Sequence, residues 1–201
     1  MATLTFHGAA RQVTGSCYLL ETAHSRVLIE CGLFQGPPEV DRLNERPFPF
    51  KPRDIHAVVL SHAHLDHSGL LPRLKREGFD GKVYATTQAL ELLDIMLKDA
   101  AHIQEKDAEW ENRRRERAGD KLIAPLYTLQ DAEDVLTRGE PLVYGQKLRI
   151  TQDIEICLRD AGHILGSAIV ELWVDSDGRE KKIVFSGDLG NAATPLLRDP
   201  E

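Results

Sequence analysis

Apolar and polar positions divide the chain into strand-like segments, a helical middle and strand-like segments again. In the first third, short apolar runs bounded by Gly, Ser or His predict strands over residues 4–6, 17–21 and 27–30. Their short spacing indicates an antiparallel meander. A Gly- and Pro-rich loop follows, with one predicted helical turn around residues 39–44.

The next segment, residues 55–60, is a nearly continuous apolar run, which is typical of a strand buried on both faces. A short helix over 69–77 and a strand over 82–85 are predicted after it. From residue 87 to about 118 the apolar positions repeat every 3.6 residues, and Ile103 belongs to their stripe. One long helix is expected there, with Thr87 as its cap and Gly119 at its end.

The last part of the chain returns to strand patterning after a second helix over 128–138, which Thr128 would cap and Gly139 would stop. Strands are predicted over residues 141–144, 147–150, 154–159, 168–174 and 182–186. Asp177-Gly178 is the predicted hairpin turn between the last two strands. Strands, helices and strands without repeats indicate a layered α/β fold of one domain, or part of one.

Composition narrows the class of protein. The chain has 201 residues, of which 42% are hydrophobic and 28% charged, and a net charge of −7. This balance is typical of soluble globular proteins. The apolar runs are far shorter than the roughly 20 residues that span a bilayer, and no targeting segment is visible, so we expect a cytoplasmic protein without a membrane partner. The widely spaced Cys17, Cys31 and Cys157 are interpreted as reduced core thiols.

The strongest chemical signal is the segment SHAHLDH at residues 61–67, directly after the predicted buried strand. His62 and His64 are two apart in an extended segment, so their side chains point the same way and can share one ion. Neutral imidazole suits zinc. Asp66 and His67 lie past the bend and can reach a second ion. The alternative interpretation of residues 61–67 is a His-rich surface turn that binds no metal.

Two later segments offer further ligands. His163 lies between glycines at the end of one predicted strand, and Asp188 follows Gly187 at the end of another. Each is weak evidence alone, because Gly-Asp is an ordinary turn pair. The case that both residues are ligands is stronger because the metal site at residues 62–67 needs further ligands.

Four segments together resemble a known family, namely GAARQVTGS at 8–16, ECGLFQG at 30–36, SHAHLDHSG at 61–69 and SGDLG at 186–190. They are similar to the metallo-β-lactamase fold, and within it to the β-CASP branch of nucleic-acid nucleases such as ribonuclease J and the pre-mRNA 3′-end endonuclease. The resemblance covers residues 6–191 and implies an α/β fold, the αββα sandwich, with metals at one edge of the sheets.

The resemblance also implies the roles of single residues. The first zinc would be bound by His62, His64 and His163, and the second by Asp66 and His67. Asp188 would bridge the two ions, and Asp66 and Asp188 would take part in catalysis. A bridging water, deprotonated near neutral pH, would attack a phosphodiester in line.

Two departures from the family pattern affect this expectation. Glu30 stands where the branch commonly has an Asp that holds a ligand His from behind, and the extra methylene could displace His62 or His64. The family also has a β-CASP cap domain soon after the position of Asp188, followed by a return of the chain that supplies a late His. We therefore expect residues 1–201 to be the N-terminal part of the domain, which would hold one zinc well and the second poorly.

The leading functional hypothesis is a zinc-dependent hydrolase that cleaves RNA. A DNA nuclease of the same branch is the nearest alternative, and a thioesterase- or lactonase-like small-molecule hydrolase is the next. The 201-residue piece alone could also be inactive, and a homo-oligomer stays open.

The basic helix end at 112–117 is interpreted as solvated, with a phosphate-contacting patch as the alternative. His24, His56 and His102 are interpreted as surface or packing residues, and His7 as a loop residue or part of the metal cleft.

Overall fold

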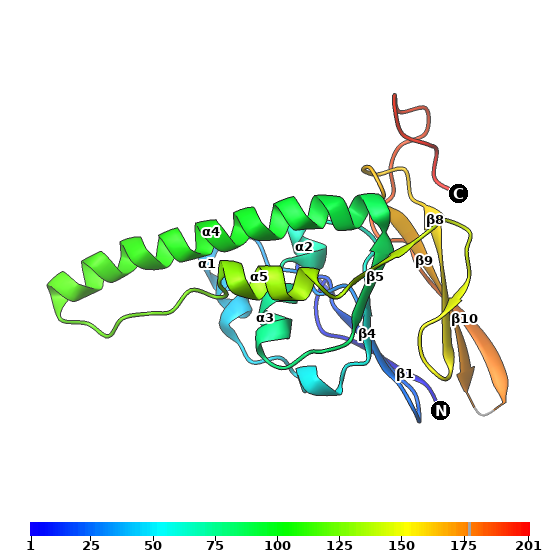
Figure 1. The fold of residues 1–201 in the computed structure, drawn as a ribbon, viewed down its shortest axis with the longest axis horizontal. Coiled ribbons are helices and arrows are strands. Elements are labelled where there is room, and N and C mark those ends of the chain that lie inside the picture. The colour runs from blue at the N-terminus through cyan, green and yellow to red at the C-terminus, as the bar shows by residue number, and fades with distance from the viewer. Residues whose placement is uncertain (177) are drawn as a thin grey trace.

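A computed structural model describes residues 1–176 and 178–201. Two sheets pack face to face, and helices cover the outer side of the first sheet (Figure 1). The first sheet has the strand order β1 (Thr3–Phe6), β2 (Tyr18–Glu21), β3 (Arg26–Ile29), β4 (Ala57–Val59), β5 (Lys82–Thr86) and β6 (Gly139–Leu142). The second has the order β10 (Arg179–Phe185), β9 (Ala168–Ser176), β8 (Ile154–Asp160) and β7 (Leu148–Arg149).

The first sheet changes direction at β3. Strands β1, β2 and β3 pair antiparallel, which confirms the predicted meander, and β3 to β6 pair parallel. Strand β4 is buried on both faces as predicted: Val58 belongs to the core under the helices, whereas Ala57 and Val59 belong to the core between the sheets. The parallel strands place the polar residues after β4 at one edge of the sandwich.

The helical layer consists of the elements α1 (Pro38–Asp41), α2 (Leu65–Ser68), α3 (Leu71–Arg76), α4 (Thr87–Ala118) and α5 (Leu129–Leu136), with short 3₁₀ turns at Arg42–Glu45 and Pro52–Asp54. Helix α4 ends at Gly119, which has φ +74°, as predicted. Its cap is Thr86 and not Thr87, because the Thr86 side chain accepts the hydrogen bond from the N–H of Ala89. Thr128 caps α5 as predicted, but Gly139 begins β6 and does not end the helix.

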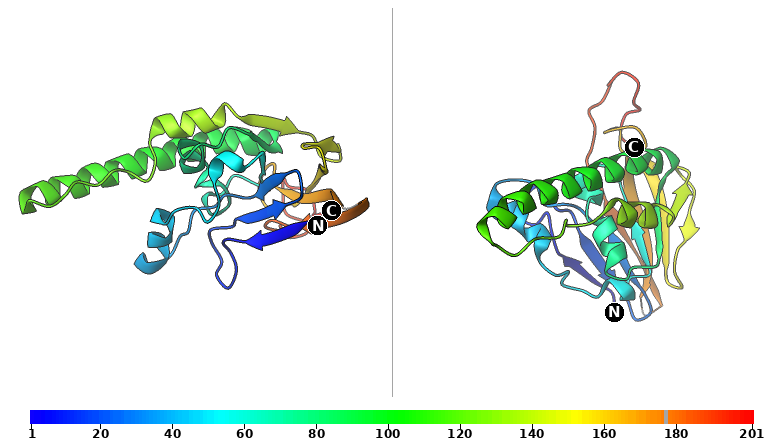
Figure 2. Two further views of the ribbon diagram at one scale, coloured as in Figure 1. Left: turned by 90° about the horizontal axis from the view of Figure 1, so that it is seen from below. Right: turned by 60° about the vertical axis from the view of Figure 1, so that its left-hand side comes forward.

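The C-terminal half of α4 extends away from the sheets (Figures 1 and 2). Its last buried residue is Ala108, and nothing beyond it packs on the sheet. Ile103 is 50% exposed although Ala108, further along the helix, is buried, so its predicted place in the buried stripe was wrong.

The second sheet is antiparallel throughout, and β10 pairs over its full length with residues 170–176 of β9. The predicted turn residue Asp177 lies outside the described residues. In the described ranges 1–176 and 178–201, no helix covers the outer face of this sheet, so the layers are helix, sheet and sheet (Figure 2). The three cysteines are buried and free, as predicted. None of the described helices is long and apolar enough to cross a membrane.

Candidate metal centre

The His-rich segment begins where β4 ends, and it is held by backbone contacts before the short helix α2. The Ser68 hydroxyl donates to the carbonyls of Ala63 and His64 at 3.0 and 2.9 Å, which closes the turn. On the other side, the carbonyl of Asp66 accepts from the N–H of Ser16 at 2.9 Å, and that of His67 accepts from the N–H of Cys31 at 2.8 Å. The turn is therefore fixed from both sides.

His62 is fully buried and its ring is oriented by the residue before it. The Ser61 hydroxyl lies 2.9 Å from His62 Nδ1, which leaves Nε2 facing the open side of the turn. There it lies 3.0 Å from His64 Nδ1. The two rings predicted to share an ion are thus side by side.

His163 reaches the same place from the loop after β8. Its backbone N–H donates to the Ser167 hydroxyl at 3.0 Å, and the loop is tied to the start of α4 by the Thr86 hydroxyl, which donates to the Gly166 carbonyl at 2.6 Å. His163 Nε2 then lies 3.3 Å from His64 Nδ1. Ser167 and Thr86 escaped prediction, because a loop serine and a helix cap have no chemical signature in the sequence.

Asp188 reaches the group from the loop after β10. The preceding Gly187 has φ +54°, and a Cβ there would lie 2.7 Å from the Cβ of Ser61, so a glycine is required at this close approach. Asp188 Oδ2 lies 3.5 Å from His163 Nε2 and 3.9 Å from His62 Nε2. Its side chain is 45% exposed, which leaves this side of the group open to solvent.

These four side chains form one group whose ligand atoms all lie within 4.8 Å of one another. Ligands about 2.0–2.1 Å from a tetrahedral zinc ion are about 3.3 Å apart. The distances given above, from 3.0 to 3.9 Å, lie around that value. Three imidazoles and one carboxylate at these separations fit a zinc ion.

A second, smaller group lies on the other side of Asp188. His67 Nε2 is 3.4 Å from Asp188 Oδ1 and 3.7 Å from Asp66 Oδ2. The side chain of His67 is 7% exposed and that of Asp66 is 21% exposed. One oxygen of Asp188 thus faces His62 and His163, and the other faces His67.

Glu30 lies behind the second group. Its backbone has φ +63°, its Oε1 accepts from the N–H of Ser61 at 2.8 Å, and its Oε2 lies 3.7 Å from His67 Nδ1. Glu30 therefore faces His67, and neither His62 nor His64 is displaced from the first group.

The electrostatic environment favours neutral imidazoles. Burial lowers the pKa of His62 to about 2, with a further contribution from the neighbouring histidines. Burial also lowers the pKa of His67, against the opposing effect of Asp66 and Asp188. Because a metal binds the unprotonated ring, both histidines are in the binding form at neutral pH.

The comparison with known families agrees with this geometry. The model described as "Metallo-beta-lactamase superfamily" matches residues 10–148. The chain belongs to this superfamily. Ribonuclease TTHA0252 of Thermus thermophilus is 40% identical over 193 residues, which are 96% of this chain and 39% of that protein. An RNase J-like protein of Methanocaldococcus jannaschii is 30% identical over 197 residues, 98% of this chain and 38% of the relative.

Both relatives are β-CASP proteins, which confirms the resemblance seen in the sequence. The chain spans about two fifths of their length. A solved metallo-beta-lactamase of Cronobacter sakazakii shares the fold, with a TM-score of 0.54 and 22% identity over 91% of this chain and 60% of that one. The predicted α/β metallo-β-lactamase fold is confirmed.

Within this superfamily fold, the structure brings all six predicted metal residues to one edge of the sandwich. The histidines outside the motifs lie elsewhere: His56 Nδ1 accepts the N–H of Arg26 at 2.9 Å, and His24 and His102 are exposed. His7 packs against Phe50, with ring centroids 5.2 Å apart, and lines a neighbouring cavity.

Proposed function

We propose that the chain forms the metal-binding part of a zinc-dependent hydrolase that cleaves phosphodiester bonds of RNA. The observation that carries the proposal is the placement of Asp188, with His62 and His163 at one oxygen and His67 at the other. A carboxylate that offers one oxygen to each set can join two ions a few ångströms apart, which is the arrangement of two-metal hydrolytic sites.

Different side chains would bind the two zinc ions. His62, His64 and His163, with Asp188, would hold the first zinc, and Asp66 and His67, with Asp188, the second. Two zinc ions bound there would supply a hydroxide at neutral pH and neutralise charge on the phosphoryl oxygens. Glu30 would lie behind His67, on the Nδ1 side of its ring.

Asp66 and Asp188 are the two carboxylates at the open side of the centre. The exposed edge of Asp188 admits the substrate phosphate, since its side chain is nearly half exposed. Asp66, beside His67, would act by holding the second zinc, and the proton that the leaving oxygen needs would come from the solvent that reaches the open side at Asp188. The displaced oxygen then leaves as a hydroxyl.

RNA is proposed as the substrate because two relatives are named as ribonucleases or RNase J-like. The matched part is under half of each relative, so the cap domain and the late His implied by the resemblance are proposed to complete the second group in a longer protein. Zinc could serve other hydrolytic reactions in the same centre, and a DNA nuclease is the second candidate.

The test combines metal analysis with three substrate classes. The purified complete protein is analysed for bound zinc, and then assayed on single-stranded RNA, single-stranded DNA and a thioester or lactone. Stoichiometric zinc with RNA cleavage that chelation abolishes is the expected result. Stoichiometric zinc without cleavage of any RNA would refute the proposal, and turnover of only the thioester or lactone would assign a small-molecule hydrolase.

A further inference from the structure

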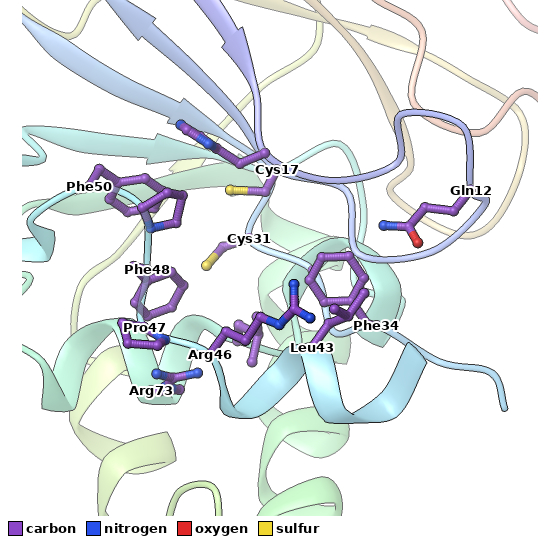
Figure 3. Close-up of a pocket in the computed structure, with 14 residues that line it drawn as sticks. Gln12, Cys17, Cys31, Phe34, Leu43, Arg46, Pro47, Phe48, Phe50 and Arg73 are labelled. Atoms are coloured by element: carbon purple, nitrogen blue, oxygen red, sulfur yellow. The ribbon is translucent and has the colours of Figure 1, made fainter. Parts of the chain in front are cut away.

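Three large apolar side chains of helix α4 lie open to solvent. Ile95 is 65% exposed, Ile103 50% and Trp110 67%. In the cavity of Figure 3, by contrast, the rings of Phe48 and Phe50 stack 5.3 Å apart at 28°, so the apolar side chains there pack on one another. An exposed apolar face such as that of α4 indicates a surface where another molecule docks.

The three residues share one face of α4, on the side away from the core. Each residue advances about 100° around the helix axis, so all three lie within about 80° of one another. The buried residues are centred on the other side of the helix, namely Ala89, Leu93, Leu97, Ala100, Ala101 and Ala108. A second molecule can therefore lie along the exposed face without displacing the core, and the C-terminal half of α4 projects from the sheets (Figures 1 and 2).

Charged residues on the same face are separated by sign along the helix. Glu91 and Asp99 lie in the first half of α4, and Arg113 and Arg117 lie near its end. All four side chains are exposed, and none has an ion pair or a side-chain hydrogen bond within residues 1–176 and 178–201. We call the face that these four residues form with Ile95, Ile103 and Trp110 the outer stripe.

An antiparallel second copy of α4 complements the charges of the outer stripe. When a two-fold axis passes near residue 105, Arg117 of one copy lies beside Glu91 of the other, and Arg113 lies beside Asp99. The symmetry forms each of these pairs twice. In a parallel pair, like charges would face each other, so the separation of sign favours the antiparallel arrangement.

The same register brings the apolar residues together. Trp110 of one copy lies opposite the turn between Ile95 and Ile103 of the other, and the symmetry repeats this contact at the other end. Tryptophan is one of the residues that most often dominate the binding energy of an interface. Lys106 lies near the axis and faces its own copy, but its charge is already paired with Glu109 at 3.0 Å. The centre of the pair therefore brings no unpaired like charges together.

We propose that the outer stripe is a dimer interface, at which two copies of this protein pair their α4 helices antiparallel. A nucleic acid strand would suit only the basic end of the stripe, because Glu91 and Asp99 would repel its phosphates. An apolar segment of another protein would cover the three apolar residues but would leave the charges at both ends unpaired. The second copy accounts for both features.

A charge swap tests the pairing directly. The mass of the complete protein is measured by sedimentation equilibrium over a range of concentrations, and a monomer–dimer equilibrium is expected. Arg117→Glu and Glu91→Arg should each weaken the dimer roughly tenfold, because like charges then meet twice. The double variant E91R/R117E should restore it, since opposite charges meet again. Glu133→Arg, at an exposed position of α5, is the matched control and should leave the dimer unchanged.

The apolar contact is tested in the same measurement. Trp110→Ala should weaken the dimer at least about tenfold, the usual effect of truncating a dominant interface residue. Val143→Ala, which removes an apolar side chain that is 66% exposed outside α4, should have no effect. Bound zinc and the midpoint of urea unfolding, measured for each variant, show that it is folded.

Cross-linking distinguishes antiparallel from parallel helices. The native cysteines are buried, so a short bis-maleimide reacts with an introduced cysteine first. Lys106→Cys, near the axis, should cross-link to its own copy. Arg117→Cys should not, because its two copies lie about 36 Å apart along the helices, but it should cross-link to Glu91→Cys in a mixture of the two variants.

The outcomes decide the proposal independently of the nuclease function. A protein that stays monomeric at every concentration overturns it, as does a dimer that neither charge variant weakens or that the double variant does not restore. Cross-linking of Arg117→Cys to itself would show a parallel pair and overturn it too. If Arg117→Glu weakened RNA binding but left the mass unchanged, the basic end would be assigned to nucleic acid instead.

Discussion

Glu30 Oε2 lies 3.7 Å from His67 Nδ1, and neither buried atom has a hydrogen-bond partner among the residues that the structure describes. At this distance the two atoms form no hydrogen bond, but they share one desolvated space. Glu30 is 2% exposed, so the charge of its carboxylate is costly there. Burial accordingly raises the pKa of Glu30 to about 8, although the hydrogen bonds from Ser61 oppose this.

Glu30→Gln is expected to change how the stability of the metal-free protein depends on pH. Between about pH 5 and 8 the folded state keeps a proton on Glu30 that the unfolded state has lost, since an unperturbed Glu titrates near 4.3. The free energy of unfolding therefore falls as the pH rises toward 8 and then levels off. The Gln variant lacks this fall.

Urea unfolding in EDTA at several pH values measures this difference between wild type and variant. The histidines act in both proteins alike: their lowered pKa values cost stability as the pH falls below about 6.5. Glu140→Gln, at an exposed ion pair with Lys82, is the control and should keep the wild-type profile. Parallel profiles for wild type and Glu30→Gln would contradict the buried, protonated carboxyl.

Asp188→Asn should weaken both zinc sites, because this one side chain belongs to both groups of ligands. The amide keeps the shape but loses the negative charge and one oxygen. We expect the zinc affinity of the first site to fall at least about tenfold. Even the loss of a residue that only hydrogen-bonds to a metal ligand lowers metal affinity about 10–100-fold. Zinc affinity is measured against a competing chelator, and RNA cleavage should fall in parallel.

His163→Ala is the matched comparison for this variant, because His163 faces only the first group. It should weaken the first site and spare the ligands of the second. His102→Ala, an exposed residue on α4, should affect neither. If Asp188→Asn impaired one site alone, the bridging role would be wrong.

Much of this centre could be predicted from the sequence because its ligands come directly after strands. The apolar run before SHAHLDH predicts strand β4, so the imidazoles are expected directly after its end. The parallel pairing of β4 with its neighbours then determines the edge of the sheet at which they lie. The same holds for the strands themselves, whose β-branched and apolar runs carry their own signal.

Contacts between distant segments could not be predicted in this way. Thr86 caps α4 in place of Thr87 because its hydroxyl is also needed by the Gly166 carbonyl, 80 residues away. Ile103 was assigned to the buried stripe from the helical period, but it is 50% exposed while Ala101 and Ala108 are buried, because it lies about 200° around the helix from Ala101. The side chain of Glu30 points toward His67 because its backbone has a positive φ, and no local sequence pattern predicts that φ.

A zinc titration of the 201-residue chain should show two unequal steps. The first group offers three imidazoles and a carboxylate oxygen, whereas the second offers one imidazole and two carboxylate oxygens. Zinc prefers nitrogen over oxygen donors at comparable geometry, and four ligands close its tetrahedron. Calorimetry should therefore resolve one tight site and one weaker site. Two sites of equal affinity would contradict this assignment.

Gly32→Ala should destabilise the protein and disturb the second zinc site in particular. A Cβ on Gly32 would lie 1.7 Å from the carbonyl oxygen of Asp66, and the Gly32 N–H is itself bonded to the Ser16 carbonyl at 2.8 Å. The turn that carries Asp66 and His67 must then move away, and overpacking of this kind costs about 1–3 kcal/mol. The effect should appear in urea unfolding and in the weaker step of the zinc titration.

Gly119→Ala separates this steric effect from the general cost of replacing a glycine. Gly119 has φ +74° and nothing within 4 Å of an added Cβ, so alanine there is strained but displaces no neighbour. It should cost about 1–2 kcal/mol and leave both zinc steps unchanged, because it lies at the far end of α4. Since the two variants are expected to lose similar stability, only the zinc titration distinguishes them. An unchanged weaker step in Gly32→Ala would show that the contact between Gly32 and Asp66 does not position the second site.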